Sequence, residues 1–414
     1  MSTILRNHNF LFLFLGRLIT NIGDSIYAIA TIWLVYDLTK DPLFTGIATA
    51  LVMIPGAFTF LIGPLVDRWS LRKILVRTQL IEFTLISIIP ISYFLGFLNV
   101  WIILVIMPLA AFVEQFVYPA QQAALPKILG KDQLVQGNSL MSMAYQGTDL
   151  IFMGLSGVLI IIFGAINLFI IDAITFVIAA GFFRMILISK DFQHGEITKA
   201  KYKQELVEGF QVVKGSFISK FLILIIFANF IYGAINAILP AYADYRGNSA
   251  YFGLYLASLT TGILLGSISA SLLKKLPIGK TVIIGSTISS ILWIFSSLAE
   301  NHIISLILFG LSFIPIGYLN VTIFTILQIS ISEELIGRVF SFIGSITVLS
   351  MPLGAVIGGA VAKWIGAENV FIMGATGNIL IAMFWLFTPN LRRYSSIMKN
   401  QEKIDCTDVE ASPL

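Results

Sequence analysis

Four ionisable side chains lie deep inside long apolar runs of this sequence: Arg17, Asp24, Glu114 and Asp149. If these runs cross a bilayer, each ionisable group costs about 2.5–3.5 kcal/mol on insertion scales and needs a physical reason to be there. A carboxyl group at such a depth can hold a proton or bind a cation, and one occupant excludes the other. The pattern therefore favours reversible proton or cation binding.

The spacing of Arg17 and Asp24 places both on one side of a helix, because they are separated by two helical turns. Asp24 lies near the middle of its apolar run, where it could exchange a proton for a ligand. Two structural alternatives stay open. Asp24 could pack against Asn21 or Ser25 through hydrogen bonds, or it could form a permanent ion pair with Arg17.

The other acidic residues of the apolar runs fall into two groups, those deep in the membrane and those near its surface. Glu114 and Asp149 are deep enough to form a proton relay with Asp24, or one of them could pair with the cation of the first run. We expect Gln115 to face another side of its helix. Glu82 and Asp172 lie nearer the ends of their runs, where water can reach, so we predict structural roles for them.

The sequence shows no motif for catalysis, metal binding or nucleotide binding. The three histidines lie at the ends of apolar runs or between them, and there is no phosphate-binding Walker motif, metal-ligand cluster or nucleophile–base set. We therefore predict a protein that is not an enzyme and carries no cofactor or metal.

The composition indicates what must position these residues. The chain of 414 residues is 57% hydrophobic and 12% charged, with a mean hydropathy of +0.91, whereas soluble domains average about 25% charged residues. This predicts an all-α membrane protein with many spans, surrounded by lipid. The pI of about 9.0 does not indicate nucleic-acid binding, because the cations lie in short segments between apolar runs. Cys406 is the only cysteine, so no intrachain disulfide can form.

Twelve apolar runs are long enough to cross a bilayer core, which takes roughly 20 residues per helix. They lie near 9–36, 44–65, 74–96, 100–120, 136–162, 166–188, 220–243, 251–273, 279–299, 302–328, 338–363 and 367–388. The first has no cleavage site, so we interpret it as a membrane helix and not a signal peptide. The predicted organisation is a six-helix bundle over 1–188, a cytoplasmic linker over 189–219, a second bundle over 220–388 and a cytoplasmic tail over 389–414.

The basic residues predict the orientation. With the N-terminus in the cytoplasm, the cluster at 68–77, the lysine-rich linker and the basic tail all fall inside. Only Lys40, Arg246 and Lys363 fall outside. We therefore expect both termini in the cytoplasm.

The two halves share sequence. "GAINLFI" at 164–170 recurs as "GAENVFI" at 366–372, with five of seven residues identical and both between the fifth and sixth runs of their half. "TGIATAL" at 45–51 and "FGLYLAS" at 252–258 also open equivalent runs. Parallel repeats of six helices are a transporter architecture.

The charged stretch "IGPLVDRWSLRKILV" at 62–76 follows the second run and resembles the signature loop of the major facilitator superfamily. Gly63, Asp67 and Arg68 match that pattern, and Arg72 and Lys73 lie in or beside its basic positions, although Ser70 replaces the usual glycine. The resemblance implies that the acid and the cations form a gating latch between the two halves. The alternative is that the cations only anchor the topology.

Two further segments resemble the macrolide-efflux and siderophore-exporter branch of that superfamily: "VYPAQQAALPKILGKDQLVQGNSL" at 117–140, after the fourth run, and "LIGRVFSFIGSITVLSMPLGAVIGG" at 335–359. The resemblance implies the major facilitator fold with twelve helices in two six-helix bundles, in a bacterial cytoplasmic membrane. It also implies that the first and fourth helices of each half line a central cavity, with Asp24 facing it.

The resemblance predicts a monomeric secondary active exporter that exchanges protons for a small molecule, such as a macrolide-like drug or a metallophore, without nucleic acid. Polar residues that could line its substrate cavity are Tyr27, Asn229, Tyr232, Asn236, Tyr318 and Asn320. Two alternatives remain open: a lysophospholipid transporter or flippase of the same fold, and a membrane sensor that transports nothing.

Overall fold

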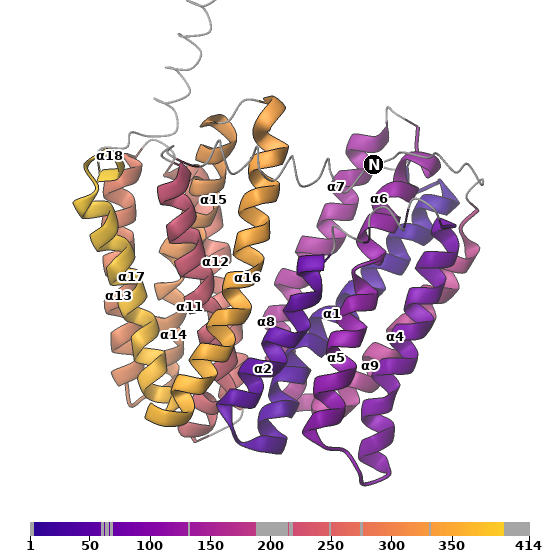
Figure 1. The fold of residues 1–414 in the computed structure, drawn as a ribbon, viewed down its shortest axis with the longest axis horizontal. Coiled ribbons are helices and arrows are strands. Elements are labelled where there is room, and N and C mark those ends of the chain that lie inside the picture. The colour runs from indigo at the N-terminus through magenta and orange to yellow at the C-terminus, as the bar shows by residue number, and fades with distance from the viewer. Residues whose placement is uncertain are drawn as a thin grey trace, which may run out of the picture.

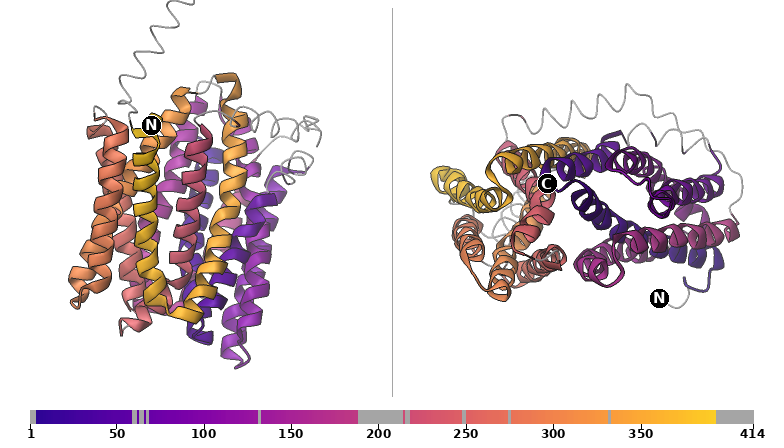
Figure 2. Two further views of the ribbon diagram at one scale, coloured as in Figure 1. Left: turned by 60° about the vertical axis from the view of Figure 1, so that its left-hand side comes forward. Right: turned by 90° about the horizontal axis from the view of Figure 1, so that it is seen from below.

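The computed structural model describes residues 4–58, 62, 66, 69–130, 133–187, 214, 218–247, 250–273, 276–330 and 333–392. Within these ranges the chain folds into helices joined by short connections (Figure 1). The helices run roughly side by side in two groups, as the view from below shows (Figure 2). This is the arrangement expected of two helical bundles.

The N-terminal bundle consists of elements between His8 and Met185. They are α1 (His8–Thr39), α2 (Pro42–Met53), η1 (Ile54–Phe58), α4 (Leu71–Phe94), α5 (Val100–Glu114), α6 (Val117–Ile128), α7 (Leu134–Ser142), η3 (Met143–Gly147), α8 (Thr148–Phe163) and α9 (Ala165–Met185). The element η3 is π-helical and joins α7 to α8. The fourth span is made of α5 and α6, and the fifth of α7, η3 and α8.

The C-terminal bundle consists of elements between Ile218 and Arg392. They are α11 (Ile218–Tyr245), α12 (Ala250–Leu272), α13 (Ile278–Leu298), α14 (His302–Ser312), α15 (Ile314–Ser330), α16 (Glu333–Ile365), α17 (Ala367–Phe387) and the short α18 (Pro389–Arg392). The tenth span is made of α14 and α15. Most of the linker predicted at 189–219, and the tail beyond residue 392, lie outside the described residues.

The twelve predicted spans correspond to these elements. In the part of the chain that the structure describes, nine helices are long and apolar enough to cross a membrane, and two shorter apolar segments cover 42–56 and 349–365. The span built from α7, η3 and α8 completes the set. The sequence pattern placed a loop after residue 120, but α6 continues the fourth span to Ile128. Its Pro119 lies in the first turn, where a missing N–H breaks no helical hydrogen bond.

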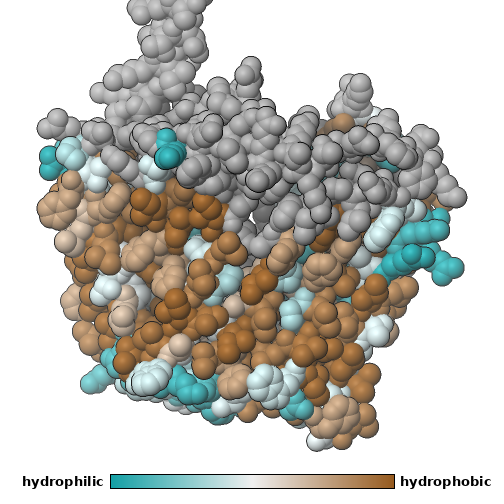
Figure 3. Space-filling model, viewed as in Figure 1, coloured by the Kyte–Doolittle hydropathy of each residue, from teal (hydrophilic) through white to brown (hydrophobic). Residues whose placement is uncertain are grey.

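Apolar side chains cover the outside of both bundles. Figure 3 shows a broad brown band with polar residues along its lower margin. Large exposed side chains in it include Trp101, Phe94 and Phe387, with exposed fractions of 65%, 69% and 72%. Such a surface is suited to lipid, because apolar side chains there need no shielding from water.

Small residues bring α11 and α16 into close backbone contact. A Cβ added at Gly354 would lie 1.9 Å from the carbonyl oxygen of Phe230, and one added at Gly233 would lie 2.0 Å from that of Met351. Only glycine allows such an approach, which gives van der Waals packing between helices in lipid. Glycine contacts therefore pack α11 closely against α16 in the C-terminal bundle.

The two bundles meet at the lower end of Figure 1, where α1 ends and α2 begins. The Lys363 Nζ lies 2.5 Å from Asp41 Oδ2, and the Thr45 hydroxyl donates a hydrogen bond of 2.5 Å to the carbonyl oxygen of Ala237. These contacts join α2 of one bundle to α11 and α16 of the other. We call this set of contacts the lower junction.

The ion pair of the lower junction gives a first prediction. Asp41→Asn keeps the side-chain oxygen that accepts a hydrogen bond from the Leu43 N–H at the start of α2, but it removes the charge. Since exposed ion pairs contribute about 0.2–1 kcal/mol, we expect the junction to open about two- to fivefold more often. The readout is the rate at which a water-soluble maleimide labels a cysteine placed at Thr49, which is buried two turns along α2.

The Lys363→Met variant should raise the labelling rate equally, and the double variant should add nothing further. Lys40→Met is the matched control. Lys40 pairs with Asp37 at 2.9 Å within the same helix segment, so its loss should leave labelling unchanged. Equal labelling in all variants would show that the pair does not hold the junction.

Candidate functional site

One face of α1 carries the charged residues of the site. Gly16 and Gly23 pack closely against α9, since a Cβ at Gly23 would lie 2.2 Å from the Asp172 carboxylate. Arg17, Asn21 and Asp24 project about a quarter turn away from that packed face. The packing of α1 on α9 therefore turns the three polar side chains toward the rest of the bundle.

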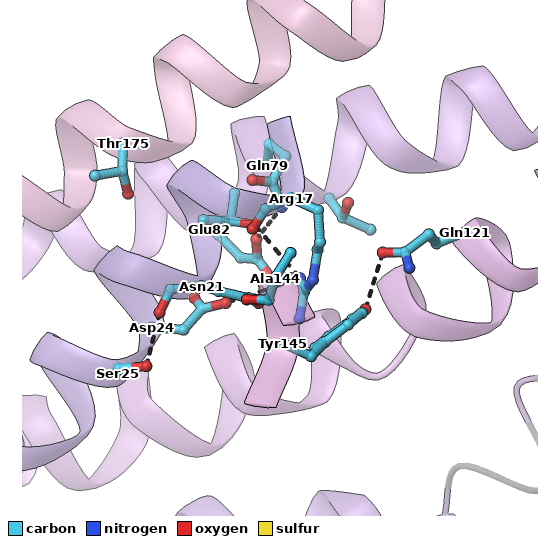
Figure 4. Close-up of polar contacts among 12 residues, drawn as sticks. Arg17, Asn21, Asp24, Ser25, Gln79, Glu82, Gln121, Ala144, Tyr145 and Thr175 are labelled. Carbon is cyan, nitrogen blue, oxygen red and sulfur yellow. Dashed lines mark hydrogen bonds and ion pairs between the residues drawn. The ribbon is translucent and has the colours of Figure 1, made fainter. Parts of the chain in front are cut away.

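These three side chains line a cavity of about 270 Å³ together with Glu114, Gln115, Tyr118 and Tyr145. The lining comes from α1, from the junction of α5 and α6, and from η3. Figure 4 shows Arg17, Asn21 and Asp24 of α1 beside Tyr145 of η3. The cavity thus contains one guanidinium group and two carboxyl groups, which can bind protons or a cation.

Arg17 is held by two kinds of contact. Its Nη1 lies 3.8 Å from Asp24 Oδ2, and the exposed fractions of the two side chains are 5% and 14%. Its guanidinium carbon lies 4.2 Å above the centroid of the Tyr145 ring, a cation–π contact that gains strength when it is desolvated. Asp24 therefore lines the cavity, as proton exchange would require, and it also contacts Arg17, as the ion-pair alternative predicts.

The π-helical segment η3 positions Tyr145. A π-turn widens the helix and leaves a backbone carbonyl available, and here Asn21 Nδ2 donates a 2.8 Å hydrogen bond to the carbonyl oxygen of Ala144. The Tyr145 hydroxyl donates to Gln121 Oε1 at 3.0 Å. These two bonds fix the Tyr145 ring beneath Arg17.

Gln115 lies in the same cavity as Glu114, which corrects the prediction that it faces another side of the helix. That prediction assumed one continuous fourth span. The helix α5 ends at Glu114, and the chain turns before α6 begins at Val117. The interruption brings neighbouring residues to one cavity.

Glu82 and Asp172 are buried, with exposed fractions of 2% and 0%, so the prediction that water reaches them was wrong. Glu82 lies at the middle of α4, which begins at Leu71, and its Oε2 accepts a 2.7 Å hydrogen bond from Gln79. Its Oε1 has no hydrogen-bond partner among the described residues. Arg17 interacts electrostatically with Glu82 as well as with Asp24 and Glu114.

Three of the predicted substrate-cavity residues meet in the C-terminal bundle. Asn229, Tyr232 and Asn320 line a second cavity, of about 120 Å³, between α11, α13, α15 and α17. Its other lining residues are mainly apolar. The two cavities differ in chemistry, since the first is charged and the second is apolar with amides.

The remaining predicted site residues lie elsewhere. Tyr27 and Tyr318 are each 4% exposed and belong to apolar cores, and neither lines either cavity. Asn236 is 9% exposed and donates to the Tyr232 carbonyl oxygen. Asp149 lies in α8, but its side chain is outside the described set, so its proton-relay role stays a prediction.

Of the predicted gating loop, Gly63, Asp67 and Arg68 lie outside the described residues. Arg72 Nη2 donates to the carbonyl oxygen of Arg184, which joins α4 to the end of α9 within one bundle. Lys73 is exposed. In the described ranges no group of three or more potential metal ligands occurs.

Within the described residues, twelve spans in two bundles, with ionisable residues around an internal cavity, have the architecture of a transporter of the major facilitator fold. A family model described as transmembrane secretion effector matches residues 2–412. The chain belongs to this family of the major facilitator superfamily, and it is a transporter and not an enzyme.

Comparison with individual proteins agrees with this assignment. Macrolide efflux protein A of Streptococcus pyogenes is 26% identical over 396 residues, covering 91% of this chain and 95% of that protein. The multidrug efflux pump Tap of Mycolicibacterium fortuitum is 22% identical, covering 92% and 96%. A bacterial homologue of the lysosomal transporter Spinster, in an inward-facing and occupied conformation, has a similar structure with a TM-score of 0.71 at 11% identity, covering 97% of this chain and 99% of that one.

Proposed function

We propose that the protein is a proton-coupled exporter of an amphipathic small molecule, with Asp24 as the main proton-binding residue. The observation that carries this proposal is the net charge of the ionisable side chains grouped around Arg17 in the N-terminal bundle. One guanidinium, from Arg17, interacts with the carboxyl groups of Asp24, Glu114 and Glu82. If all three were ionised, the buried cluster would carry net negative charge, which a low-dielectric interior disfavours. Each proton or cationic group that binds lowers the negative charge by one unit.

Asp24 is the carboxyl group best placed for exchange. It lines the cavity, and its 3.8 Å contact with Arg17 is long for an ion pair. A proton on Asp24 would release Arg17, which Tyr145 can still hold, and loss of that proton would restore the pair. Cargo that competes with the proton for Asp24 would thereby be coupled to proton flow.

The direction of transport rests on the basic residues. The first turn of α4, which contains Arg72 and Lys73, lies toward the upper end of Figure 1, opposite the lower junction. Under the positive-inside rule that end faces the cytoplasm, with both termini inside. The lower junction would then close the outer side, and this conformation would be inward-facing. Asp67 and Arg68 would form the latch that closes the inner side in the alternate state.

The cargo class follows from the two cavities and the relatives. A charged cavity in one bundle and an apolar one with amides in the other suit a molecule with a polar part and an apolar part. The names of the relatives refer to macrolide and multidrug efflux, and a macrolide-like compound has this character. A secreted metallophore is the second candidate, because amides and a cation can bind its oxygen-rich groups.

The test of this function uses purified protein in proteoliposomes with an imposed pH gradient and a radiolabelled macrolide. Proton-coupled export predicts uptake into vesicles that are acidic inside, when the cytoplasmic side of the protein faces out, and loss of uptake when an ionophore collapses the gradient. A strain lacking the gene should also show either raised macrolide susceptibility or a metabolite missing from spent medium. Absence of gradient-driven uptake for every fraction of that medium would refute the proposal.

The Tyr145 ring gives a graded prediction. Tyr145→Phe keeps the ring under Arg17 and loses only the bond to Gln121, so we expect the transport rate to stay within about threefold of wild type. Tyr145→Leu removes the cation–π contact, worth about 0.5–2 kcal/mol, and should lower the rate about tenfold. Initial rates in the same proteoliposomes measure both. Equal loss in the two variants would assign the effect to the hydroxyl group and not to the ring.

A further inference from the structure

The cavity of the C-terminal bundle has a lining unlike that of the N-terminal one. It measures about 120 Å³, and its wall includes Trp293, Phe313 and Trp385 as well as the amides of Asn229 and Asn320. The residues around it include no acidic, basic or histidine side chain. A charged group placed there would find no counter-ion, so the lining selects neutral, apolar material.

The helix α11 packs against two neighbouring helices beside the cavity. A Cβ at Gly377 or Gly374 would meet Ile231 or Ile235, so that face of α11 packs against α17, while Phe230 packs against Gly354 of α16. Ala228 and Asn229 of the same helix line the cavity. Ala228 and Asn320 are exposed, so they mark the mouth of the cavity.

The deep wall of the cavity contains the indole N–H donor of Trp293. Trp293 is 2% exposed, and its indole Nε1 has no hydrogen-bond partner among the described residues. Asn378, also in the wall, already donates to the Ser289 hydroxyl at 3.0 Å. Buried donors are normally paired, so an acceptor atom inside the cavity would satisfy the indole N–H.

We propose that this cavity binds a single neutral ring of the exported molecule, with an acceptor atom of that ring facing the Trp293 N–H. The proposal rests on the export function proposed above and names the part of the cargo that the C-terminal bundle recognises. An apolar cavity of about 150 Å³ holds one benzene molecule, so one ring fits and a whole macrolide does not. The rest of the cargo stays outside the mouth formed by Ala228 and Asn320.

A lipid acyl chain is the competing occupant, and the cavity argues against it. A chain has no acceptor atom for Trp293, and the ring-sized volume accommodates only a short part of it. The amides at the mouth would also contact methylene groups there, which satisfies none of their hydrogen bonds.

The experiment measures binding of two ring probes to the full-length protein in lipid nanodiscs by ¹⁹F NMR. The probes are fluorobenzene and 3-fluoropyridine, which differ in one ring atom, the acceptor nitrogen. We expect both to bind wild-type protein, and Ala228→Phe, which blocks the mouth, to weaken both at least tenfold. Val321→Phe is the control, since Val321 is exposed on α15 beside Asn320 and outside the lining.

Trp293→Phe separates the hydrogen bond from the volume. It should weaken 3-fluoropyridine about fivefold, the size of a typical net hydrogen bond, and leave fluorobenzene within twofold. Equal effects on both probes, or no effect of Ala228→Phe, would overturn the proposal. Binding seen only after lipid has been stripped off in detergent would assign the cavity to an acyl chain and would also overturn it.

The outcome is independent of the proton-coupling proposal. If Asp24→Asn leaves gradient-driven export intact while the ring probes bind as described, the coupling scheme fails and the ring site stands. If export depends on Asp24 but the probes do not distinguish the variants, the ring site fails alone.

Discussion

Asp24→Asn should abolish proton-driven export while the protein still folds and inserts. Asparagine has nearly the same shape as aspartate but cannot release a proton, so the exchange of proton for cargo at this position stops. We expect gradient-driven uptake in proteoliposomes to fall at least a hundredfold. Exchange of labelled for unlabelled cargo, which needs no net proton movement, should continue at a rate within about tenfold of wild type.

The fold should survive this change because Arg17 keeps a second partner. Its contact with the Tyr145 ring at 4.2 Å and its bond to the Thr20 hydroxyl at 3.5 Å do not involve Asp24. Removing one member of a buried ion pair usually costs about 3–5 kcal/mol, and the aromatic contact offsets part of that cost. Thermal unfolding of the purified variant measures what remains.

The matched control is Asp37→Asn, which removes a carboxyl group from the same helix. Asp37 is 54% exposed and pairs only with Lys40 among the ion pairs of the described residues, so transport should be unchanged. If Asp24→Asn behaved like this control, with normal rate and normal dependence on the pH gradient, Glu114 or Glu82 would have to carry the proton instead.

Helical periodicity explains how much of this site was predictable. A spacing of seven residues puts Arg17 and Asp24 on one face of any regular helix, and the structure brings them into contact. Asn229 and Tyr232 were predicted from their polar groups alone, and their spacing of three residues on α11 brings both to one cavity. Such predictions need only the geometry of a single helix.

The unpredicted part of the site depends on contacts between helices. Tyr145 reaches Arg17 through the π-helical segment η3, and no apolar pattern reveals where a helix gains the extra residue of a π-turn. Glu82 was assigned to a span end because the start of its helix was placed too late; α4 begins at Leu71. Because the start of this helix was misplaced, Glu82 was predicted to be accessible to water, whereas it is buried.

The sequence analysis also assigned two residues of α15 to the same cavity, and only one of them lines it. Tyr318 and Asn320 were both predicted to line the substrate cavity, but positions separated by two residues point about 200° apart on a helix. Asn320 lines the cavity, and Tyr318 is buried in an apolar core. The sequence identified the right helix, and only the packed structure distinguishes its faces.

The second large effect is expected at the lower junction, from Gly46→Val. A Cβ at Gly46 would lie 2.3 Å from the carbonyl oxygen of Ala355, a backbone atom of α16. Backbone cannot swing aside as a side chain can, so α2 and α16 would have to separate by about 1 Å to reach ordinary contact. We expect the junction to stay open and transport to fall at least tenfold, because alternating access needs this end to close.

Cross-linking measures the junction directly. In a Cys406→Ser background, Asp41→Cys and Lys363→Cys place two thiols where the ion pair was, and a short bifunctional thiol reagent should join them. Adding Gly46→Val should reduce cross-linking at least fivefold. Adding Gly181→Val should not, because a Cβ at Gly181 meets nothing within 4 Å. Full cross-linking together with lost transport would mean that the junction closes despite the valine, and that α2 has another role in moving cargo.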